Sequence, residues 1–454
     1  MINTEPLSGV ANAMAAALGF PGYRYAVVSH PVGSLDAEAV RALAEFAAPQ
    51  VLALLCGAAP EAERDDTEVA AASAASPQGP EVDLTATADR AGARSELDLA
   101  VDLVESCFGK GYTDGLPVVP PVASLVERFL ATTAQGRDEV AWAMPELDRV
   151  CTIETAAANA VMAGCRPEHF PVVLAAIEAI VEEGALVSGG GAGSSSGGGP
   201  LLIVNGPVRN ALGFNSAGNV FGPGYRANTT VGRAVRLILM NAFGVRPPTL
   251  DQSLQGSPLK YTCCIAENEE ASPWAPLHVD LGRAPGDSTV SALWVRSVEH
   301  VDNRRSTDPT HILNDLADTM ARSGATTRQQ WRQCVVLGPM HAQLVARAGM
   351  TKEDVKAYLS AHAGKLQSEL ARVGKQGVAQ GQASAREEGA PRQVRVPARP
   401  GTEPVPGDEF VLTVPDPSHI LVVVAGGTHV EVSSVLQPFT GGWRVPGVGV
   451  VRDR

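Results

Sequence analysis

The chain has 454 residues and a mass of 47.1 kDa, a length that favours two or three domains. Hydrophobic residues make up 45% of it and the mean hydropathy is +0.03, so a sizeable core can be buried. The formal charge of −13, from 36 basic and 49 acidic residues, excludes a general nucleic-acid binder, which needs a basic footprint. Small anionic substrates stay compatible with it, because a local site can be positive on an acidic protein.

The sequence also argues against a membrane or secreted protein. The longest apolar run, at about 172–181, contains Glu178 and is followed by Glu182 and Glu183. It falls short of the roughly 18 residues that span a bilayer. The N-terminus lacks a basic region and carries Glu5 early, unlike a secretory signal. Seven cysteines without a dense framework favour a reducing compartment, so we expect a cytoplasmic protein.

The predicted fold class is α/β (mixed α+β), and it begins with a partial Rossmann-like layer. This N-terminal block, 1–56, contains an apolar strand at 25–28 and an amphipathic helix at 36–55. It is too short to bury a comfortable core by itself.

Two polar segments divide the rest of the chain. Residues 57–94 and 376–408 are rich in small, polar and charged residues, so both are predicted to be flexible linkers. The larger α/β body, 95–375, lies between them and is expected to hold the catalytic site. Residues 409–454 are predicted to form a block of strands that packs on the body.

Apolar periodicity predicts the main elements of the body and the C-terminal block. The predicted helices are 97–108, 153–164, 171–183, 231–241, 306–322 and 352–370. The predicted buried strands are 201–204 and 420–425. A capping box of Thr351 and Asp354 indicates where the last helix begins.

A segment of almost pure Gly and Ser, 188–199, precedes the strand at 201–204. It lacks the Lys-Ser/Thr ending of a P-loop and precedes a strand instead of following one. We interpret it either as a mobile loop or lid, or as backbone that contacts an anion directly.

The segment 215–230 is rich in Asn and Gly and lies immediately before the predicted helix at 231–241. Its Asn219, Arg226 and Asn228 can present amides and a guanidinium to a carboxylate. The alternative is a polar loop whose side chains satisfy one another.

Three acids follow a short apolar stretch, and they are harder to explain as ordinary surface residues. Glu267, Glu269 and Glu270 repel one another when ionised, which favours an acid/base pair or a metal. Lys260 precedes them and His278 follows them. No His-x-x-x-His or Cys-x-x-Cys pattern supports a defined metal site, so no metal ligand is predicted.

Several thiols lie near these candidates. Cys263 and Cys264 are adjacent, so they rarely pair with each other, and on a strand only one can face a site. Cys165 is flanked by Arg166, with His169 close by and a helix following, a setting that lowers a thiol pKa. The alternative for each thiol is simple packing as a small buried side chain.

The body resembles the large region of the proteins called the UGSC family, named for a selenocysteine-or-cysteine/Gly/Ser/Cys motif. The matching segments are TDGLPVVPP at 113–121, NAVMAGCRPEHFPVV at 159–173, VNGP at 204–207, FGPGYRAN at 221–228, AENEE at 266–270, LGPMHA at 337–342 and VAGG at 424–427. Together they cover most of the body.

The N-terminal block resembles the last third of the family's small region, ending at about Gly33. In those relatives the family motif lies upstream of this point, whereas here no such motif occurs, and Cys56 is followed by Gly57-Ala58-Ala59. Three expectations follow: a separate subunit supplies the thiol, the protein works without it, or translation begins upstream of Met1.

The resemblance implies thiol-dependent cleavage of a carbon–heteroatom bond, since the family motif is similar to that of the substrate-activating selenoprotein of glycine reductase. We therefore expect an enzyme for a small polar, carboxylate-bearing metabolite, either a lyase or transferase or one with a thiol-dependent reductive step. Its site is expected in a homo-oligomer or beside a thiol-bearing subunit. One alternative is a non-catalytic large subunit that scaffolds a thiol- or selenol-bearing partner. Another is a metal-dependent hydrolase that uses the acids with His278 or His169.

These hypotheses assign roles to twelve residues. The predicted catalytic residues are Glu267, Glu269, Glu270, Cys264 and Cys165. The predicted substrate-binding residues are Asp114, Asn205, Asn219, Arg226, Asn228, Lys260 and His278. The sequence identifies no cofactor.

Overall fold

The fold is known from a computed structural model. The structure describes residues 2–4, 8–17, 20–29, 37–55, 96–183, 197–304, 306–322, 332–375, 408–428, 431–438 and 446–452. Both predicted linkers, apart from Asp408, and most of the Gly/Ser segment 188–199 lie outside these residues. None of the helices in the described part of the chain is both long and apolar enough to cross a membrane.

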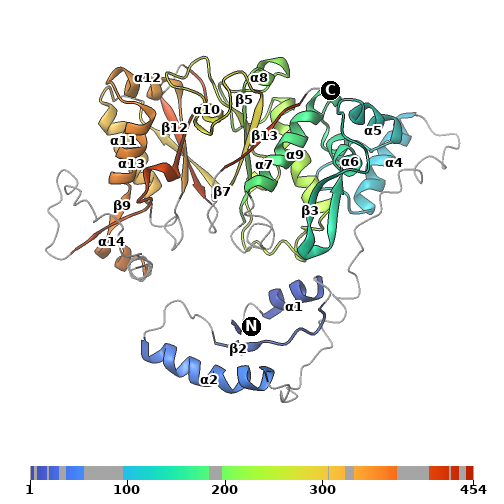
Figure 1. The fold of residues 1–454 in the computed structure, drawn as a ribbon, viewed down its shortest axis with the longest axis horizontal. Coiled ribbons are helices and arrows are strands. Elements are labelled where there is room, and N and C mark those ends of the chain that lie inside the picture. Colours follow the sequence, from blue (N-terminus) through green and yellow to red (C-terminus); the bar gives the residue numbers. More distant parts are fainter. Residues whose placement is uncertain are drawn as a thin grey trace.

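A mixed seven-stranded sheet forms the centre of the body (Figure 1). Its strands are β5 (Gly199–Asn205), β6 (Cys264–Ala266), β7 (Thr289–Asp302), β8 (Gln333–Leu337), β11 (Ile420–Val424), β12 (Val432–Pro438) and β13 (Gly447–Val450). The order is β11-β8-β12-β7-β5-β6, and β13 also pairs with β7. The pairs β5–β6 and β8–β11 are parallel and the other pairs are antiparallel. The predicted α/β class is confirmed.

The sheet is curled, so its two edge strands come together beyond their carboxyl ends. The backbone N–H of Asn268, two residues after β6, donates to the carbonyl of Val424 at the end of β11 over 2.7 Å. The N–H of Gly426 donates to the carbonyl of Ser216 over 2.8 Å. Polar residues that follow β5, β6 and β11 are therefore gathered in one region.

Helices cover the sheet over two apolar clusters. On one side α7 (Phe170–Glu183) packs on β7 and β13, and α6 (Ile153–Ala163) and α9 (Arg226–Asn241) pack against each other and on α7. The other side carries α11 (Pro309–Met320), α12 (Pro339–Arg347) and α13 (Lys352–His362). Alternate residues of β8 and β11 face the two clusters, because side chains alternate along a strand: Val336 and Val423 belong to the first, Val335 and Val422 to the second.

The N-terminal block forms a small sheet of its own. It contains β1 (Ile2–Thr4), α1 (Ser8–Ala17), β2 (Ala26–Val28) and α2 (Ala37–Leu55). β1 and β2 pair in parallel, and no body strand within the described residues joins them (Figure 1). The side-chain amide of Gln50 on α2 accepts from Val27 N at 3.1 Å and donates to Val27 O at 3.2 Å, so it satisfies backbone groups of β2 as a neighbouring strand would.

The smaller elements surround this framework. They are α4 (Glu96–Gly109), α5 (Ala123–Leu130), β3 (Val140–Met144), β4 (Arg149–Thr152), α8 (Val208–Ala211), α10 (Leu277–Asp280), β9 (Gly364–Leu366), α14 (Gln367–Arg372), β10 (Phe410–Leu412) and short 3-10 helices at 145–147, 167–169, 258–260 and 417–419.

Most predicted elements are found with small changes of boundary, and two predictions are wrong in part. The helix predicted over 352–370 ends at His362, because Gly364 begins β9 and lies so close to β10 that an added Cβ would be 2.5 Å from Val411 O. The helix predicted at 231–241 begins earlier, at Arg226, so its first turn includes residues that were expected in a loop. The capping box of Thr351 and Asp354 is confirmed.

Candidate functional site

Parallel pairing of β5 and β6 brings an amide and a carboxyl together. Val204 is the register partner of Ala266, so the next residues, Asn205 and Glu267, lie side by side where the two strands end. Asn205 Nδ2 donates to Glu267 Oε2 over 2.7 Å, and both side chains are fully buried. The apolar run before Asn205 makes β5 a buried strand, which is why this polar pair is excluded from water.

Glu267 is held by backbone donors as well as by Asn205. The N–H of Leu277 donates to Oε2 over 2.7 Å, and the N–H of Val424 lies 3.5 Å from Oε1. Burial raises the pKa of the Glu267 carboxyl, and the charge of Lys352 and these hydrogen bonds oppose that effect without cancelling it. The neutral, protonated form is therefore favoured here relative to water.

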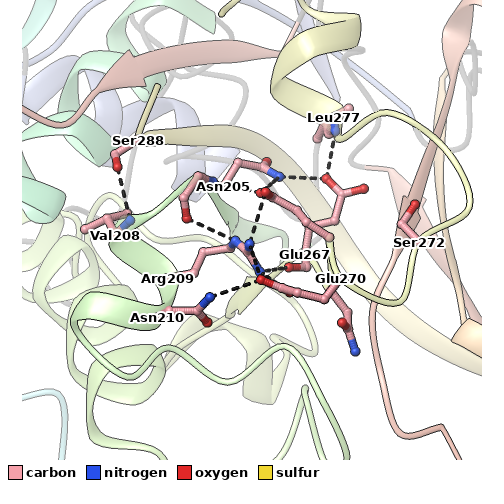
Figure 2. Close-up of polar contacts among 12 residues, drawn as sticks. Asn205, Val208, Arg209, Asn210, Glu267, Glu270, Ser272, Leu277 and Ser288 are labelled. Atoms are coloured by element: carbon pink, nitrogen blue, oxygen red, sulfur yellow. Dashed lines mark hydrogen bonds and ion pairs between the residues drawn. The ribbon is translucent and has the colours of Figure 1, made fainter. Parts of the chain in front are cut away.

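Arg209 joins the three acids, and the sequence analysis missed it. It lies on α8, just after the Gly206-Pro207 turn that ends β5, and its guanidinium is buried. Figure 2 shows the guanidinium directed at Glu270. Nε donates to Gly206 O, and Nη1 donates to the backbone carbonyl of Glu267 over 2.7 Å. The fork then contacts Glu270 at 3.0 and 3.1 Å and Glu269 at 3.0 Å.

Glu269 and Glu270 differ from Glu267 in exposure and in charge. Glu269 accepts from Asn205 Nδ2 over 3.0 Å and from the N–H of Gly206 over 2.7 Å, and its side chain keeps 16% exposure. Glu270 is exposed, and the hydrogen bonds from Arg209 lower its pKa to about 2. One carboxyl of the cluster is thus pushed toward its neutral form and another toward its ionised form. Such a divergence is what separate acid and base roles require.

Two side chains, one in this cluster and one next to it in the chain, carry buried polar atoms without a hydrogen-bond partner among the described residues. His278 follows Leu277, is fully buried, and has no hydrogen-bond partner on either ring nitrogen within the described residues. Asn205 Oδ1 is likewise buried without a partner there. A buried polar atom without a partner is costly, so both are places where a bound water or ligand would be stabilised. The prediction that His278 binds substrate stays a prediction.

The structure places the thiols in the core. Cys165, Cys263 and Cys264 are all buried, and burial raises the pKa of Cys165 and of Cys263 to about 12 and that of Cys264 as well. The hydrogen bond with Thr230 and the charge of Arg226 oppose this effect at Cys165 but are smaller. The lowered pKa that we considered for Cys165 is therefore wrong, because desolvation outweighs the neighbouring charge.

The predicted Asn and Arg ligands are held by the backbone around α9. Arg226 donates from Nε to Gly164 O over 2.9 Å and from Nη2 to Cys165 O over 3.4 Å. Asn228 is buried and bonds the backbone of Asn215 and the carbonyl of Cys264. Asn219 adopts a φ of 61° and donates to Pro223 O. This is the self-satisfied arrangement that was the alternative.

Asp114 and Lys260 belong to other ion pairs. Asp114 binds Arg233 with both carboxylate oxygens, at 2.8 and 2.9 Å. Lys260 pairs with Asp251 at the opposite ends of β5 and β6 from Glu267. Of the predicted site residues, the structure therefore brings together Asn205 and the three acids. The proximity of the three acids to one another followed from sequence adjacency, whereas Asn205 joins them through the pairing of β5 with β6. Arg209 had only one signal in the sequence, its place just after a buried strand.

Within the described residues, no group of three or more His, Cys, Asp or Glu side chains is arranged to hold a metal ion. The acids of the cluster are engaged by Asn205 and Arg209 instead. The metal-dependent alternative thus gains no support from their geometry.

Fold and site together define a mixed α/β protein with an acidic cluster where β5 and β6 end. Residues 1–57 match the sequence model of the UGSC family. The predicted resemblance is confirmed for this N-terminal segment, and that of the body, 95–375, stays a prediction. Comparison with curated proteins and with solved structures found no match to the chain.

Proposed function

We propose that the chain is an enzyme that breaks or forms a carbon–heteroatom bond in a small polar molecule by acid–base chemistry. The observation that carries this proposal is the divergence between Glu267, whose pKa is raised by burial, and Glu270, whose pKa is lowered to about 2 by Arg209. Glu267 is thereby favoured as a neutral carboxyl beside Asn205, and Glu270 as the ion-pair partner of Arg209. Glu269, which contacts both Asn205 and Arg209, is left as the carboxyl that can exchange a proton with a substrate.

In the proposed arrangement Glu269 meets the substrate. It is the partly exposed acid nearest to the buried pair, and it shares the Asn205 amide nitrogen with Glu267. Glu269 takes a proton from one carbon, the C–H electron pair forms a double bond to the neighbouring carbon, and the heteroatom on that carbon leaves with its bonding electrons, which is lyase chemistry. Glu267 holds Asn205 in place, and burial, which raises its pKa, disfavours a second negative charge at that position.

The polar character of the substrate follows from the cluster. The negative charge of Glu270, together with the acceptor oxygens of Glu269, favours a neutral or amine-bearing group beside them and disfavours a carboxylate. Arg209 is fully used by the two acids and two backbone carbonyls, so it offers no free cation. A carboxylate elsewhere on the substrate stays a prediction from the sequence.

One observation favours the partner alternative. The segment that matches the UGSC family forms a two-stranded sheet that no body strand within the described residues extends. Gln50 satisfies Val27 of β2, so the edge that a further strand could pair with is the other side of β1. A large subunit that works beside a separate thiol- or selenol-bearing chain, or as a homo-oligomer, is therefore the second proposal.

Native mass spectrometry of protein from its own host, with the small-molecule fraction retained, tests both proposals. A bound polar metabolite should be converted by the wild type, with conversion followed by liquid chromatography and mass spectrometry. Glu269→Gln should lower the rate at least a hundredfold, a loss that is typical of removing an acid–base group. The exposed Glu353→Gln is the matched control and should leave the rate unchanged. A normal rate in Glu269→Gln would remove the acid–base proposal, and a second polypeptide with a Cys-Gly-Ser-Cys-like motif would favour the partner proposal.

A further inference from the structure

Three cationic side chains lie around a single carboxylate near the amino ends of β5 and β6, away from the acidic cluster, and two of them, Arg236 and Lys260, bind it. Arg236 lies on α9, Arg246 lies in the turn after that helix, and Lys260 ends the 3-10 helix before β6. Arg236 Nη2 binds Asp251 Oδ2 over 2.9 Å, and Lys260 Nζ pairs with the same oxygen. The Cα of Lys260 would lie 3.4 Å from a Cβ added to Gly199, the first residue of β5.

Asp251 is already saturated by these contacts. Its Oδ1 accepts from the Ser253 hydroxyl over 2.6 Å, and Lys260 Nζ donates to the same hydroxyl over 2.7 Å. The Asp251 side chain is only 2% exposed, whereas Arg236 and Lys260 keep 10% and 15%. The carboxylate is thus hidden behind its partners, and the cations retain a path to solvent.

Arg246 brings a third positive charge without an acid of its own. Its Nε donates to Met240 O over 3.1 Å and its Nη2 donates to Asn241 Oδ1, and both acceptors are neutral. The backbone N–H of Asp251 donates to the carbonyl of Arg246 over 3.1 Å, which ties the two residues together. Among the described residues, Nη1 of Arg246 and Nε and Nη1 of Arg236 have no hydrogen-bond partner.

The cluster therefore has two positive charges without a counter-charge in a half-buried position. Burial, and then the like charge of Arg236, lowers the pKa of Arg246, and burial lowers that of Lys260 despite its pairing with Asp251. Cations that are removed from water without a partner are costly, so a bound dianion would relieve this arrangement.

We propose that Arg236, Arg246 and Lys260 bind a phosphate dianion, either inorganic phosphate or the phosphoryl group of a small molecule. A phosphoryl group carries a charge of roughly −1.5 to −2 at neutral pH, which matches the two uncompensated cations. Its oxygens suit the several N–H groups of two guanidinium forks. This site is separate from the acidic cluster and does not depend on the activity proposed there.

Isothermal titration calorimetry of the full chain with inorganic phosphate tests the proposal, at constant ionic strength set with chloride. We expect saturable binding by the wild type and weak or no binding of acetate, which carries one charge. Lys260→Met should weaken phosphate binding by about tenfold, and Asp251→Asn should strengthen it because a competing carboxylate is removed. Competition with methyl phosphate distinguishes the two sources. If methyl phosphate displaces inorganic phosphate, the site accepts the phosphoryl group of a small molecule; if it does not, the site is specific for inorganic phosphate.

Lys110→Met, which removes an exposed lysine elsewhere, is the matched control and should bind phosphate as the wild type does. Thermal unfolding of each variant checks that it folds. If Asp251→Asn does not fold, Arg246→Gln takes its place, and this variant should bind phosphate more weakly than the wild type. The proposal is overturned by a wild type that does not bind phosphate above chloride, by equal affinity for acetate, or by unchanged affinity in folded Lys260→Met.

Discussion

Asn205 Nδ2 donates a hydrogen bond to Glu267 over 2.7 Å and another to Glu269 over 3.0 Å, where β5 and β6 end. An amide nitrogen has two hydrogens, so each carboxyl receives one of them. The pair Asn205–Glu267 is fully buried, and Glu269 connects it to the surface. A change at Glu267 should therefore alter the position of Asn205 and, through it, the hydrogen bonding of Glu269, the acid that reaches solvent.

Glu267→Gln should change how stability depends on pH. Because burial raises the folded-state pKa above its ordinary value of 4.5, the contribution of Glu267 to the free energy of unfolding is full below about pH 4.5. It is lost as the pH rises through the raised folded-state pKa, by at most about 1.4 kcal/mol per pH unit. The Gln side chain of Glu267→Gln does not titrate, so the variant does not show this loss. The free energy of unfolding of the wild type, minus that of the variant, should therefore decrease as the pH rises.

Denaturant unfolding between pH 4 and 8 measures this difference. The exposed Glu353→Gln is the control, and its curve should stay close to that of the wild type. A wild type that gains stability over Glu267→Gln with rising pH would mean that Glu267 is ionised in the folded protein.

Arg209→Met should destabilise the protein by about 3–5 kcal/mol, because it leaves two backbone carbonyls without their donor and two carboxyls without their positive partner. Arg137→Met removes a surface arginine that pairs with Glu127 and Glu154, and it should cost only about 0–1 kcal/mol. Urea unfolding of the two variants compares them directly. Equal losses would show that Arg209 does not organise the cluster.

The described cysteines should resist alkylation in the native protein. All six are buried, and burial raises their pKa values, that of Cys165 to about 12. At pH 8 such a thiol is ionised in only about one molecule in ten thousand, and the thiolate is the reactive form. Peptide mapping after brief iodoacetamide treatment should find them unmodified until denaturant is added. Rapid native labelling of Cys165 would instead restore it as a candidate nucleophile.

The sequence predicted what depends on neighbours in the chain and missed what tertiary folding assembles. The three acids stood out because they follow an apolar strand directly, whereas Arg209 lies about sixty residues earlier on a four-residue helix that has no apolar periodicity. No strand was predicted for β7, the longest in the sheet, because its first half is buried on both faces and its second half is partly exposed. The sequence also did not predict that the helix beginning at Lys352 ends before Gly364. That end depends on the close approach of Gly364 to β10, a contact between distant segments of the chain.

The sequence also could not predict the charges that surround Cys165 and Lys260 in the folded protein. Arg226 next to Cys165 indicated a stabilised thiolate, but the decisive quantity is desolvation, which depends on helices from distant segments. Lys260 was predicted from the sequence to bind substrate, and that role stays a prediction. Its grouping with Arg236 and Arg246 depends on how the turn after α9 returns to the sheet.

Gly206→Ala should disrupt the site through the backbone. Gly206 has a φ of 81°, a conformation that costs a residue with a Cβ about 1–2 kcal/mol, and an added Cβ would lie 2.0 Å from the carbonyl oxygen of Asp287. The turn would have to move, and with it the N–H that donates to Glu269 and the carbonyl that accepts from Arg209. We expect a loss of at least about 2 kcal/mol in the free energy of unfolding.

Gly136→Ala is the control, because its φ is not positive and nothing lies within 4 Å of an added Cβ. Its effect on unfolding should be within about 0.5 kcal/mol. The amide resonances of Glu269 and Arg209 give a second measurement, since a displaced turn shifts them in Gly206→Ala but not in Gly136→Ala. Wild-type stability and unchanged resonances in Gly206→Ala would mean that this turn does not hold the cluster in place.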